Sequence, residues 1–577
     1  MTMKKTKQLR KAVVAVLVSI MGMTTLAGCA GSSNSTTKEP EVTPTAPAVK
    51  VETEAEKTEV SLDKRKICEG VTLTIAVPEN VRIIDWETND QTLEIEEALG
   101  VDLKFKTFPA ADYDSKLNLM VMGGDKLPDI IINPGDSVYS WAQEGAIIGL
   151  KKYYDDPNMS ATIRQASEAN DIDIVSYLTQ PDGEVYCLPA WTGSPNANVW
   201  RKAWINQVWV EQLGMEMPKT TDELYEVLKK VSSTDMNGNG KQDEIGMTGY
   251  KVTGDWFRFL MSSFIYAHDS NFIVVDDGKL SFAYDTEEWR EGLRFIKKLF
   301  DEGIIPIETL TQDASQHKAM LNSEDQTVFM FTGWNPNNIS LVDRKLSYMY
   351  MNALEGPNGV KEAMYMPNLP NKGAAITADC ENPDAAFLVL DYMCSETFSI
   401  SIRYGKQGVN WDYWEDAKVD NKSEWTATTP GEEIYLIVYD DASFWGGSDA
   451  QNACYMQAGP QIVPANVVTG MAINNASTDE EENKAAQVAA RYAESTQAGL
   501  AIARKEVADY MPLTSEETEE VSGITAPLTT YVEESIGAFL TGTKSLDGDW
   551  DSYLNELDKI GYKDALSVYQ EAYDRVH

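Results

Sequence analysis

The stretch V-T-L-T-I-A-V-P, residues 71–78, is where regular secondary structure is expected to begin in this chain. Apolar side chains at Val71, Leu73, Ile75 and Val77 alternate with smaller or polar ones, and Pro78 ends the run. A period of two is typical of a β-strand. The stretch therefore predicts the first strand of an ordered lobe.

Helical and strand-like segments alternate after this strand. They are a helical stretch at 93–99, an alternating run at 101–105, a helical stretch at 113–122 and an apolar run at 130–132. Strands separated by helices at this spacing are typical of an α/β lobe with a largely parallel sheet. The chain has 577 residues, which is too long for one core, so we expect two or more lobes.

The charge of the chain limits its partners. The formal net charge is −41, and residues 1–28 contribute five positive charges and no negative ones, so the remainder stands at −46. Such a field repels other polyanions. We therefore expect no nucleic-acid partner and no docking of the folded body on an anionic bilayer.

Residues 1–28 combine a basic start, an apolar run at 12–20 and the junction Leu26-Ala27-Gly28-Cys29. The apolar run is too short to span a bilayer comfortably, which favours a cleaved export signal. The junction resembles the bacterial lipobox. That resemblance implies cleavage before Cys29, acylation of Cys29 (palmitate) and a position at the outer face of the bacterial cytoplasmic membrane. Residues 29–66 would then be the lipidated cysteine and a tether, whose polar composition predicts disorder.

A second motif lies at 235–244, D-M-N-G-N-G-K-Q-D-E. Oxygen-bearing side chains fall at its first, third, fifth and ninth positions, and Gly240 stands sixth, where a calcium loop needs a sharp turn. The twelfth position holds Gly246 in place of the usual Glu, so a closing carboxylate has to come from Asp243 or Glu244. The spacing predicts a structural Ca²⁺ site, and an acidic, glycine-rich surface turn is the alternative.

Six motifs in order resemble those of the lipoprotein solute-binding components of ABC importers for oligosaccharides, extracellular solute-binding family 1, which includes the alginate-binding proteins. The resemblance covers the chain from Cys29 to its end. The motifs are Gly124-Asp125 with Leu127-Pro128-Asp129-Ile130-Ile131, Arg201-Lys202-Ala203-Trp204 with Leu213-Gly214, Asn237-Gly238-Asn239-Gly240 with Asp243-Glu244, Asn382-Pro383-Asp384-Ala385-Ala386 with Asp391-Tyr392, Tyr404-Gly405-Lys406-Gln407-Gly408, and Trp550-Asp551-Ser552-Tyr553.

The resemblance implies a two-lobed α/β fold of the periplasmic-binding-protein type, with a ligand cleft between the lobes and a mostly helical C-terminal part. We expect the N-terminal lobe to contain residues 67–195 and 351–404. The C-terminal lobe, with the calcium loop, should contain residues 196–350 and 405–577. The chain would cross between the lobes near 191–198, near Tyr350 and near Tyr404.

The resemblance also implies the metal ligands. In this family they stand at the positions that match Asp235, Asn237, Asn239, Lys241 (by its carbonyl), Asp243 and Glu244, and the residues here suit all six. Ala203 departs from the pattern, because relatives usually place an Asp there. A polar ligand contact from that position is therefore not expected.

The tryptophans favour a carbohydrate ligand. A sugar ring has a flat C–H face and polar edges, so its site needs indoles for the faces and polar side chains for the hydroxyls. Several of the 14 tryptophans lie in glycine- and asparagine-rich contexts typical of loops. We expect Trp191, Trp256, Trp334, Trp411 and Trp445 to contact sugar rings, with Asn89 and Arg201 as polar contacts.

These observations predict a lipid-anchored, monomeric binding protein that captures an oligosaccharide and delivers it to the permease subunits of an ABC transporter. A peptide-binding importer component is one alternative, and the sequence does not exclude it. A secreted glycan-active enzyme is the other. Against an enzyme, His268, His317 and His577 form no triad or metal pattern, although a glycosidase needs only two suitably placed carboxylates.

Five cysteines follow Cys29, an odd number, so at least one is unpaired in a monomer. Their spacing matches no zinc or redox motif. Buried apolar thiols are the expected state of Cys68, Cys187, Cys380, Cys394 and Cys454.

Overall fold

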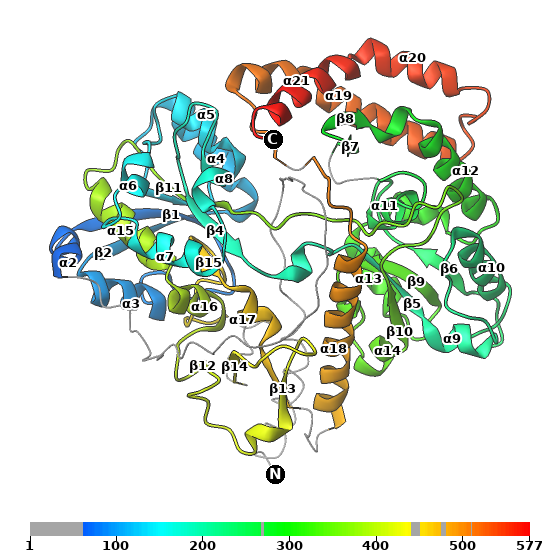
Figure 1. Ribbon diagram of the computed structural model, residues 1–577, viewed down its shortest axis with the longest axis horizontal. Helices are drawn as coiled ribbons and strands as arrows, with labels where there is room; N and C mark the ends of the chain where they lie inside the picture. Colours follow the sequence, from blue (N-terminus) through cyan, green and yellow to red (C-terminus); the bar gives the residue numbers. More distant parts are fainter. Residues whose placement is uncertain (1–61, 267–270, 440–449, 475–479, 509) are drawn as a thin grey trace, which may run out of the picture.

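The computed structural model describes residues 62–577 apart from 267–270, 440–449, 475–479 and 509. Two lobes are visible, each built around a sheet with helices packed against it, and a group of helices extends from the second lobe (Figure 1). The predicted two-lobed α/β fold is confirmed. The export signal, Cys29, most of the tether and Trp445 lie outside the described residues.

The first lobe contains a six-stranded sheet in the order β15-β4-β11-β3-β1-β2. β11 runs antiparallel to β3 and β4, and the remaining neighbours are parallel, so the sheet is largely parallel as predicted. The predicted strand at 71–78 is β1, in which Leu73, Ile75, Ala76 and Val77 are buried. The strands are β1 (Thr72–Pro78), β2 (Asp102–Phe108), β3 (Ile130–Ile132), β4 (Leu188–Thr192), β11 (Asn371–Ile376) and β15 (Gln461–Val463).

Helices of the first lobe contribute apolar side chains to one core with these strands. The predicted helix at 93–99 is α3, which starts earlier, at Asp90, because Asn89 caps it, and which ends at Gly100 with a left-handed φ of 76°. The helices are α2 (Leu62–Cys68), α3 (Asp90–Leu99), α4 (Tyr113–Gly123), α5 (Val138–Gln143), α6 (Lys151–Asp155), α7 (Ala161–Ala169), α8 (Ile174–Leu178), α15 (Pro383–Met393) and α16 (Glu396–Tyr404).

The second lobe contains a four-stranded sheet in the order β10-β5-β9-β6. β5 runs antiparallel to β9 and β10, and β6 is parallel to β9. The strands are β5 (Lys202–Asn206), β6 (Ile245–Thr248), β9 (Val328–Gly333) and β10 (Tyr348–Met351), and the helices are α9 (Gln207–Gln212), α10 (Thr221–Ser232), α11 (Asp255–Met261), α12 (Glu287–Asp301), α13 (Ala314–Leu321) and α14 (Val342–Leu346).

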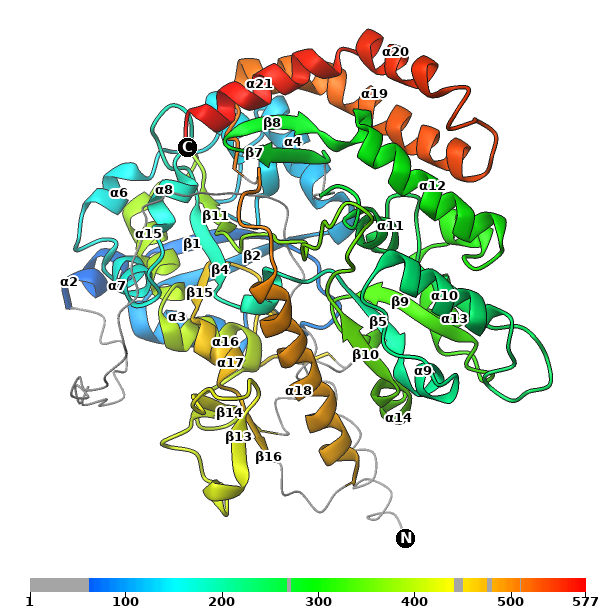
Figure 2. The same ribbon diagram turned by 45° about the vertical axis from the view of Figure 1, so that its right-hand side comes forward.

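The C-terminal part of the chain is helical and joins the second lobe. Figure 2 shows α18 running beside β10 and α14, while α19 packs on α12 and α21 on β8. A two-stranded hairpin lies beneath α21. These elements are β7 (Ile273–Asp276), β8 (Lys279–Phe282), α18 (Glu480–Ala501), α19 (Ser515–Leu540), α20 (Trp550–Ile560) and α21 (Tyr562–Asp574).

Residues 405–439 and 450–474 lie with the first lobe, which corrects the expected assignment of 405–577 to the C-terminal lobe. β15 pairs with β4 in the first sheet, and Trp411, Leu436 and Val463 form a small core with α16. A strand of three residues gives too short a period to be recognised in the sequence. The other elements of this segment are β12 (Trp411–Tyr413), β13 (Trp425–Ala427), β14 (Leu436–Val438), α17 (Ala465–Thr469) and β16 (Ala472–Asn474).

Two segments that precede β16 in the sequence connect the lobes. The first connection, residues 193–201, joins the end of β4 to the start of β5 and contains the short 3-10 helix η4 (Pro195–Ala197). The second connection, residues 352–370, joins the end of β10 to the start of β11. The side-chain amide of Asn198 donates to the carbonyl of Met366 at 3.1 Å, which holds the two connections together.

Lys202 links the start of β5 to α18 through hydrogen bonds. In the described chain, none of its hydrogen-bond partners is a carboxylate. Its fully buried Nζ donates to Ser495 Oγ at 2.8 Å and Thr496 Oγ1 at 2.7 Å. Burial lowers the pKa of Lys202 to about 7. Thr496 in turn donates to Asn196 Oδ1 in η4, so α18, β5 and the first connection are joined where the chain enters the second lobe.

In the described chain, no single helix is long and apolar enough to cross a membrane. The pair α15 and α16 would pass together by length and composition, but the two helices meet at 73° and are largely buried in the first lobe. The five cysteines beyond Cys29 are unpaired and buried, as predicted.

Burial of His317 predicts an acid-sensitive contribution to stability. The side chain is 1% exposed beside Tyr250 and Phe331, its Nε2 has no hydrogen-bond partner in the described structure, and burial lowers its pKa to about 4. Between about pH 6.5 and pH 4 the His317 imidazole binds a proton in the unfolded chain but stays neutral in the folded chain. The folded state therefore loses stability as the pH falls through this range. The loss amounts to about 2 kcal/mol at pH 5.

His317→Gln should therefore show a smaller drop in melting temperature between pH 7 and pH 5 than the wild type. The exposed His577→Gln is the control and should behave as the wild type does. An equal drop in all three proteins would show that protonation of His317 does not cause the loss of stability at acid pH.

Candidate functional site

The strand topology brings one edge of each sheet to the candidate site. β1, β2, β3, β4 and β15 end at the edge of the first sheet where β11 begins. β6 and β9 end at the edge of the second sheet where β5 begins. Both connections run between these two edges, so the edges lie close to each other. Open α/β sheets bind ligands outside the carboxyl ends of their strands, which places the candidate site between them.

Two half-buried indoles mark the second-lobe edge. Trp200 stands just before β5 and Trp334 just after β9, and Lys202 pairs with Gly333 in the ladder between these strands. The two rings lie 5.2 Å apart between centroids, at 54° to each other. We call Trp200 and Trp334 the indole pair. Their exposed surface is suited to the flat face of a ring.

A partly buried ion pair adjoins the indole pair. Arg201 Nε donates to Asp255 Oδ1 at 2.7 Å, and the Arg201 guanidinium carbon lies 4.3 Å from the centre of the Trp200 ring. The Arg201 side chain is 9% exposed and that of Asp255 is 22% exposed. Tyr250 lies nearby at the end of β6, and burial, with a contribution from Asp255, raises its pKa. The edge thus offers aromatic faces, a carboxylate and a protonated phenol.

Trp191 marks the first-lobe edge. Its Nε1 donates to the carbonyl of Asn368 in the second connection at 2.7 Å, and its ring is half-buried. A Cβ at Gly193 would lie 2.8 Å from the backbone nitrogen of Ala465 and 2.9 Å from the Trp191 ring, so only glycine lets the first connection pass so closely. Lys372, near the start of β11, forms an ion pair with Asp136 at 2.8 Å.

Trp256 and Trp411 are core residues in this structure, which corrects their expected role as ring contacts. Both are 0% exposed, and their Nε1 atoms donate to the carbonyls of Lys251 and Gly405. Trp256 follows a glycine-rich turn that suggested a loop, but it is the second residue of α11, whose side chains Trp256 to Met261 are all buried.

Asn89 is also fully buried, in contrast to the expectation of a polar ligand contact. Its Oδ1 accepts from the Gln91 backbone at 3.1 Å as the N-cap of α3, and its Nδ2 donates to the carbonyl of Cys454 at 3.2 Å. Of the expected ligand residues, Trp191, Arg201 and Trp334 lie at the two edges. No sequence signal pointed to Asp255 or Tyr250, and Trp200 was only one of several tryptophans in loop-like contexts.

The predicted calcium loop lies between α10 and β6. Asp235 accepts hydrogen bonds from the backbone of Gly238, Asn239 and Gly240, and Gly240 has a φ of 80°, as the tight turn requires. Glu244 is 7% exposed. Its Oε1 accepts from the backbone of Met236 and Asn237, while its buried Oε2 has no hydrogen-bond partner in the described chain.

An unpaired, buried carboxylate oxygen is costly, and a cation beside it would satisfy it. The loop therefore suits a hard cation that prefers oxygen ligands. In the described part of the chain, no three or more His, Cys, Asp or Glu side chains group as metal ligands, so the amides of Asn237 and Asn239 and the carbonyl of Lys241 would be needed to complete the set.

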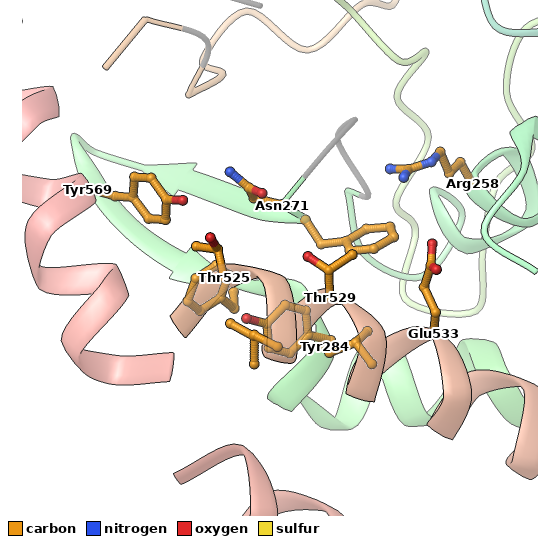
Figure 3. Close-up of a pocket in the computed structure, with 11 residues that line it drawn as sticks. Arg258, Asn271, Tyr284, Thr525, Thr529, Glu533 and Tyr569 are labelled. Carbon is orange, nitrogen blue, oxygen red and sulfur yellow. The ribbon is translucent and has the colours of Figure 1, made fainter. Parts of the chain in front are cut away.

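A pocket of about 30 Å³ lies elsewhere, between α11, the β7–β8 hairpin, α19 and α21 (Figure 3). Phe272, Phe282 and Leu528 line it, with Arg258 and Glu533 at one end. This volume suits one or two water molecules, whereas ligand sites for larger molecules usually measure hundreds of Å³. The indole pair is not part of it.

Residues 93–409 match the model of a family described as bacterial extracellular solute-binding protein. The match spans more than half of the chain, so the chain belongs to this family, whose members are binding proteins and not enzymes. The fructooligosaccharide ABC transporter substrate-binding protein FusA of Streptococcus pneumoniae is 26% identical over 505 residues, 83% of this chain and 86% of FusA. Lipoprotein LipO of Bacillus subtilis is 27% identical over 278 residues, 46% of this chain and 52% of LipO.

Solved structures share the fold. An EF-hand mutant of S. pneumoniae FusA in complex with fructo-nystose superposes with a TM-score of 0.68 at 23% identity, covering 87% of this chain and 99% of that one. The alginate-binding protein AlgQ2 without calcium ion gives a TM-score of 0.60 at 20% identity, covering 88% of this chain and 98% of that one.

The contrast between edge and core indoles predicts different costs of substitution. Trp256→Ala should lower the free energy of unfolding by about 3–5 kcal/mol, because it empties a large volume in the core. Trp334→Ala removes a ring that is already partly in solvent and should cost clearly less. Denaturant unfolding of both variants without ligand measures the difference, and equal costs would show that Trp334 also belongs to the core.

Proposed function

We propose that this protein captures an oligosaccharide between its lobes and delivers it to the permease of an ABC transporter. The indole pair beside Arg201 and Asp255 carries the proposal, because it combines flat apolar faces with hydrogen-bonding groups at the edge of the second lobe. A sugar ring needs both in one place. The similarity to FusA, a substrate-binding protein for fructooligosaccharides, supports the same ligand class.

Ligand binding would close the lobes. A ligand placed between the edges contacts the indole pair on one lobe and Trp191 on the other only when they approach, and this difference in contact shifts the population to the closed form. The two connections are the segments that would bend. Their mutual bond, from Asn198 to Met366, keeps them moving together.

Binding of oligosaccharides tests the proposal. Calorimetry against a panel of neutral and acidic oligosaccharides, fructooligosaccharides included, should find a ligand, and X-ray scattering with that ligand should give a smaller radius of gyration.

Trp200→Ala should weaken binding by roughly 1–3 kcal/mol through the lost apolar contact. Trp414→Ala is a matched control, since Trp414 and Trp425 form a similar half-buried pair, 5.9 Å apart, in the segment 405–474. Equal losses of affinity in Trp200→Ala and Trp414→Ala would show that the indole pair does not contact the ligand.

We also propose that the loop 235–244 holds one structural Ca²⁺. The support is the spacing of Asp235, Asn237, Asn239, Lys241, Asp243 and Glu244 and the unpaired Oε2 of Glu244. One solved structure with a similar fold is an EF-hand mutant of FusA. Oxygen atoms that the loop already brings together would coordinate the ion. The ion would have no part in binding the oligosaccharide.

A chelator should lower the melting temperature of the wild type, because an ion bound only to the folded state adds about 2.7 kcal/mol at a hundredfold excess over Kd. Asp235→Ala should abolish that sensitivity. Asp325→Ala, which removes an exposed partner of Lys241, should leave it unchanged. A wild type that melts at the same temperature with and without chelator would leave the loop as a plain turn.

We further propose that Cys29 becomes the lipidated amino terminus and anchors the protein to the outer face of the cytoplasmic membrane. The junction Leu26-Ala27-Gly28-Cys29 supports this, and the relative LipO is named a lipoprotein. Cys29→Ser should release the protein to the medium or leave the signal uncleaved, as seen by fractionation and intact mass. Normal processing and membrane retention of this variant would overturn the anchor.

A further inference from the structure

Two lysines are buried in the described chain, and both lie beside the indole pair. Lys202 is 0% exposed and Lys345 is 7% exposed, whereas every other lysine that the structure describes is at least partly exposed. Lys202 stands two residues after Trp200, and its partner in the ladder between β5 and β9 is Gly333, the residue before Trp334. Lys345 lies in α14 and reaches the turn that follows Trp334.

Burial of these two amines costs stability. A buried lysine is expensive unless an acid pairs with it, and in the described chain the hydrogen-bond partners of both are neutral oxygens. Burial lowers the pKa of Lys202 and also that of Lys345, to which the charge of Lys318 contributes. A methionine would fill the same space without this cost. Costly groups of this kind gather at functional sites, where they hold a geometry that the fold alone does not need.

Lys345 holds the turn that leads away from Trp334. Its Nζ donates to Asn337 Oδ1 at 2.9 Å, three residues after Trp334. On the other side of the turn, Asn322 Nδ2 donates to the carbonyl of Asn338 at 2.7 Å. The turn is therefore fixed from α14 and from the end of α13, and Trp334 stands between this fixed turn and β9.

Lys202 holds the segment that carries Trp200. Its Nζ donates to Thr496 Oγ1 at 2.7 Å, and Thr496 in turn donates to Asn196 Oδ1 at 2.5 Å. This chain of hydrogen bonds joins the two ends of residues 196–202 through α18. Trp200 lies inside the segment, so the position of its ring depends on how firmly the two ends are held.

We propose that Lys202 and Lys345 are positioning residues of the ligand site, which hold the two rings of the indole pair at a fixed distance and angle. Lys202 acts through Trp200, and Lys345 acts through Trp334. Rings that are already in place lose little freedom when a ligand binds, which favours binding. The inference rests on the proposed function for its purpose, but the positioning itself is a property of the free protein.

Circular dichroism of the free protein tests the positioning without any ligand. Two indoles in contact couple their electronic transitions, and the coupled signal depends on the distance and angle between the rings. The spectrum of a protein minus the spectrum of its Trp334→Ala version isolates the indole pair from the other tryptophans. Lys345→Met and Lys202→Met should each reduce this difference signal to about half or less, because the supporting contacts are lost.

A double variant separates loss of positioning from loss of folding. Lys345→Met together with Asn337→Leu removes both polar partners, including the buried Asn337 Nδ2 that has no hydrogen-bond partner in the described structure. It should unfold at the same or a higher denaturant concentration than the wild type, and it should still lack the difference signal. Lys229→Met is the matched control, since Lys229 pairs with Glu302 at 3.0 Å away from the indole pair, and it should keep the signal. An unchanged signal in folded Lys345→Met and Lys202→Met variants would overturn the proposal.

Binding connects the positioning to the proposed function. In calorimetry with kestose and the other members of the oligosaccharide panel, Lys345→Met should weaken binding by about fivefold or more, and it should have no further effect in a Trp334→Ala background. An equal loss in both backgrounds would show that Lys345 does not act through Trp334 and would overturn its assignment. A wild type that binds no member of the panel would overturn the proposed function, while circular dichroism would still decide whether the lysines position the rings.

Discussion

Strand pairing at both ends of the two connections fixes the geometry on which the candidate site depends. At the first lobe Ala190 of β4 pairs with Asn371 of β11, and at the second lobe Ala203 of β5 pairs with Met351 of β10. Each connection is therefore held by a ladder on both sides and cannot slide. A change in the angle between the lobes would be absorbed by backbone torsions within the two connections, residues 193–201 and 352–370.

The buried network at Lys202 adds to this constraint. An amine without a carboxylate partner in the described structure is costly to bury, and two hydroxyls from α18 reduce this cost by accepting hydrogen bonds from it. Thr496 also donates to Asn196 in the first connection, so α18 is bonded both to β5 and to the segment that leads into it. The C-terminal helices α19 and α21 pack on α12 and β8 and so extend the second lobe.

The tryptophans divide into two physical roles. Trp256 and Trp289 lie in the core of the second lobe, where their rings contact Phe257, and they add the large apolar burial that a chain of this size needs. Trp200 and Trp334 contact each other at a strand edge and keep part of their surface in solvent. Exposed aromatic surface adds little to stability. A binding role gives a physical reason for it.

Local sequence patterns were enough to predict those elements whose signal lies within one short stretch of chain. The alternation at 71–78 identified β1, the run at 130–132 identified β3, and the spacing at 235–244 described a loop that gathers oxygen atoms. Three other features became known from the folded chain: Trp256 is in the core while Trp334 lies at an edge, Asp255 pairs with Arg201 54 residues away, and β15 belongs to the first sheet. Periodicity reports how a residue stands relative to its neighbours along the chain. The exposure of a side chain and its ion-pair partner depend on which distant segment packs against it, and that information is absent from any short stretch of sequence.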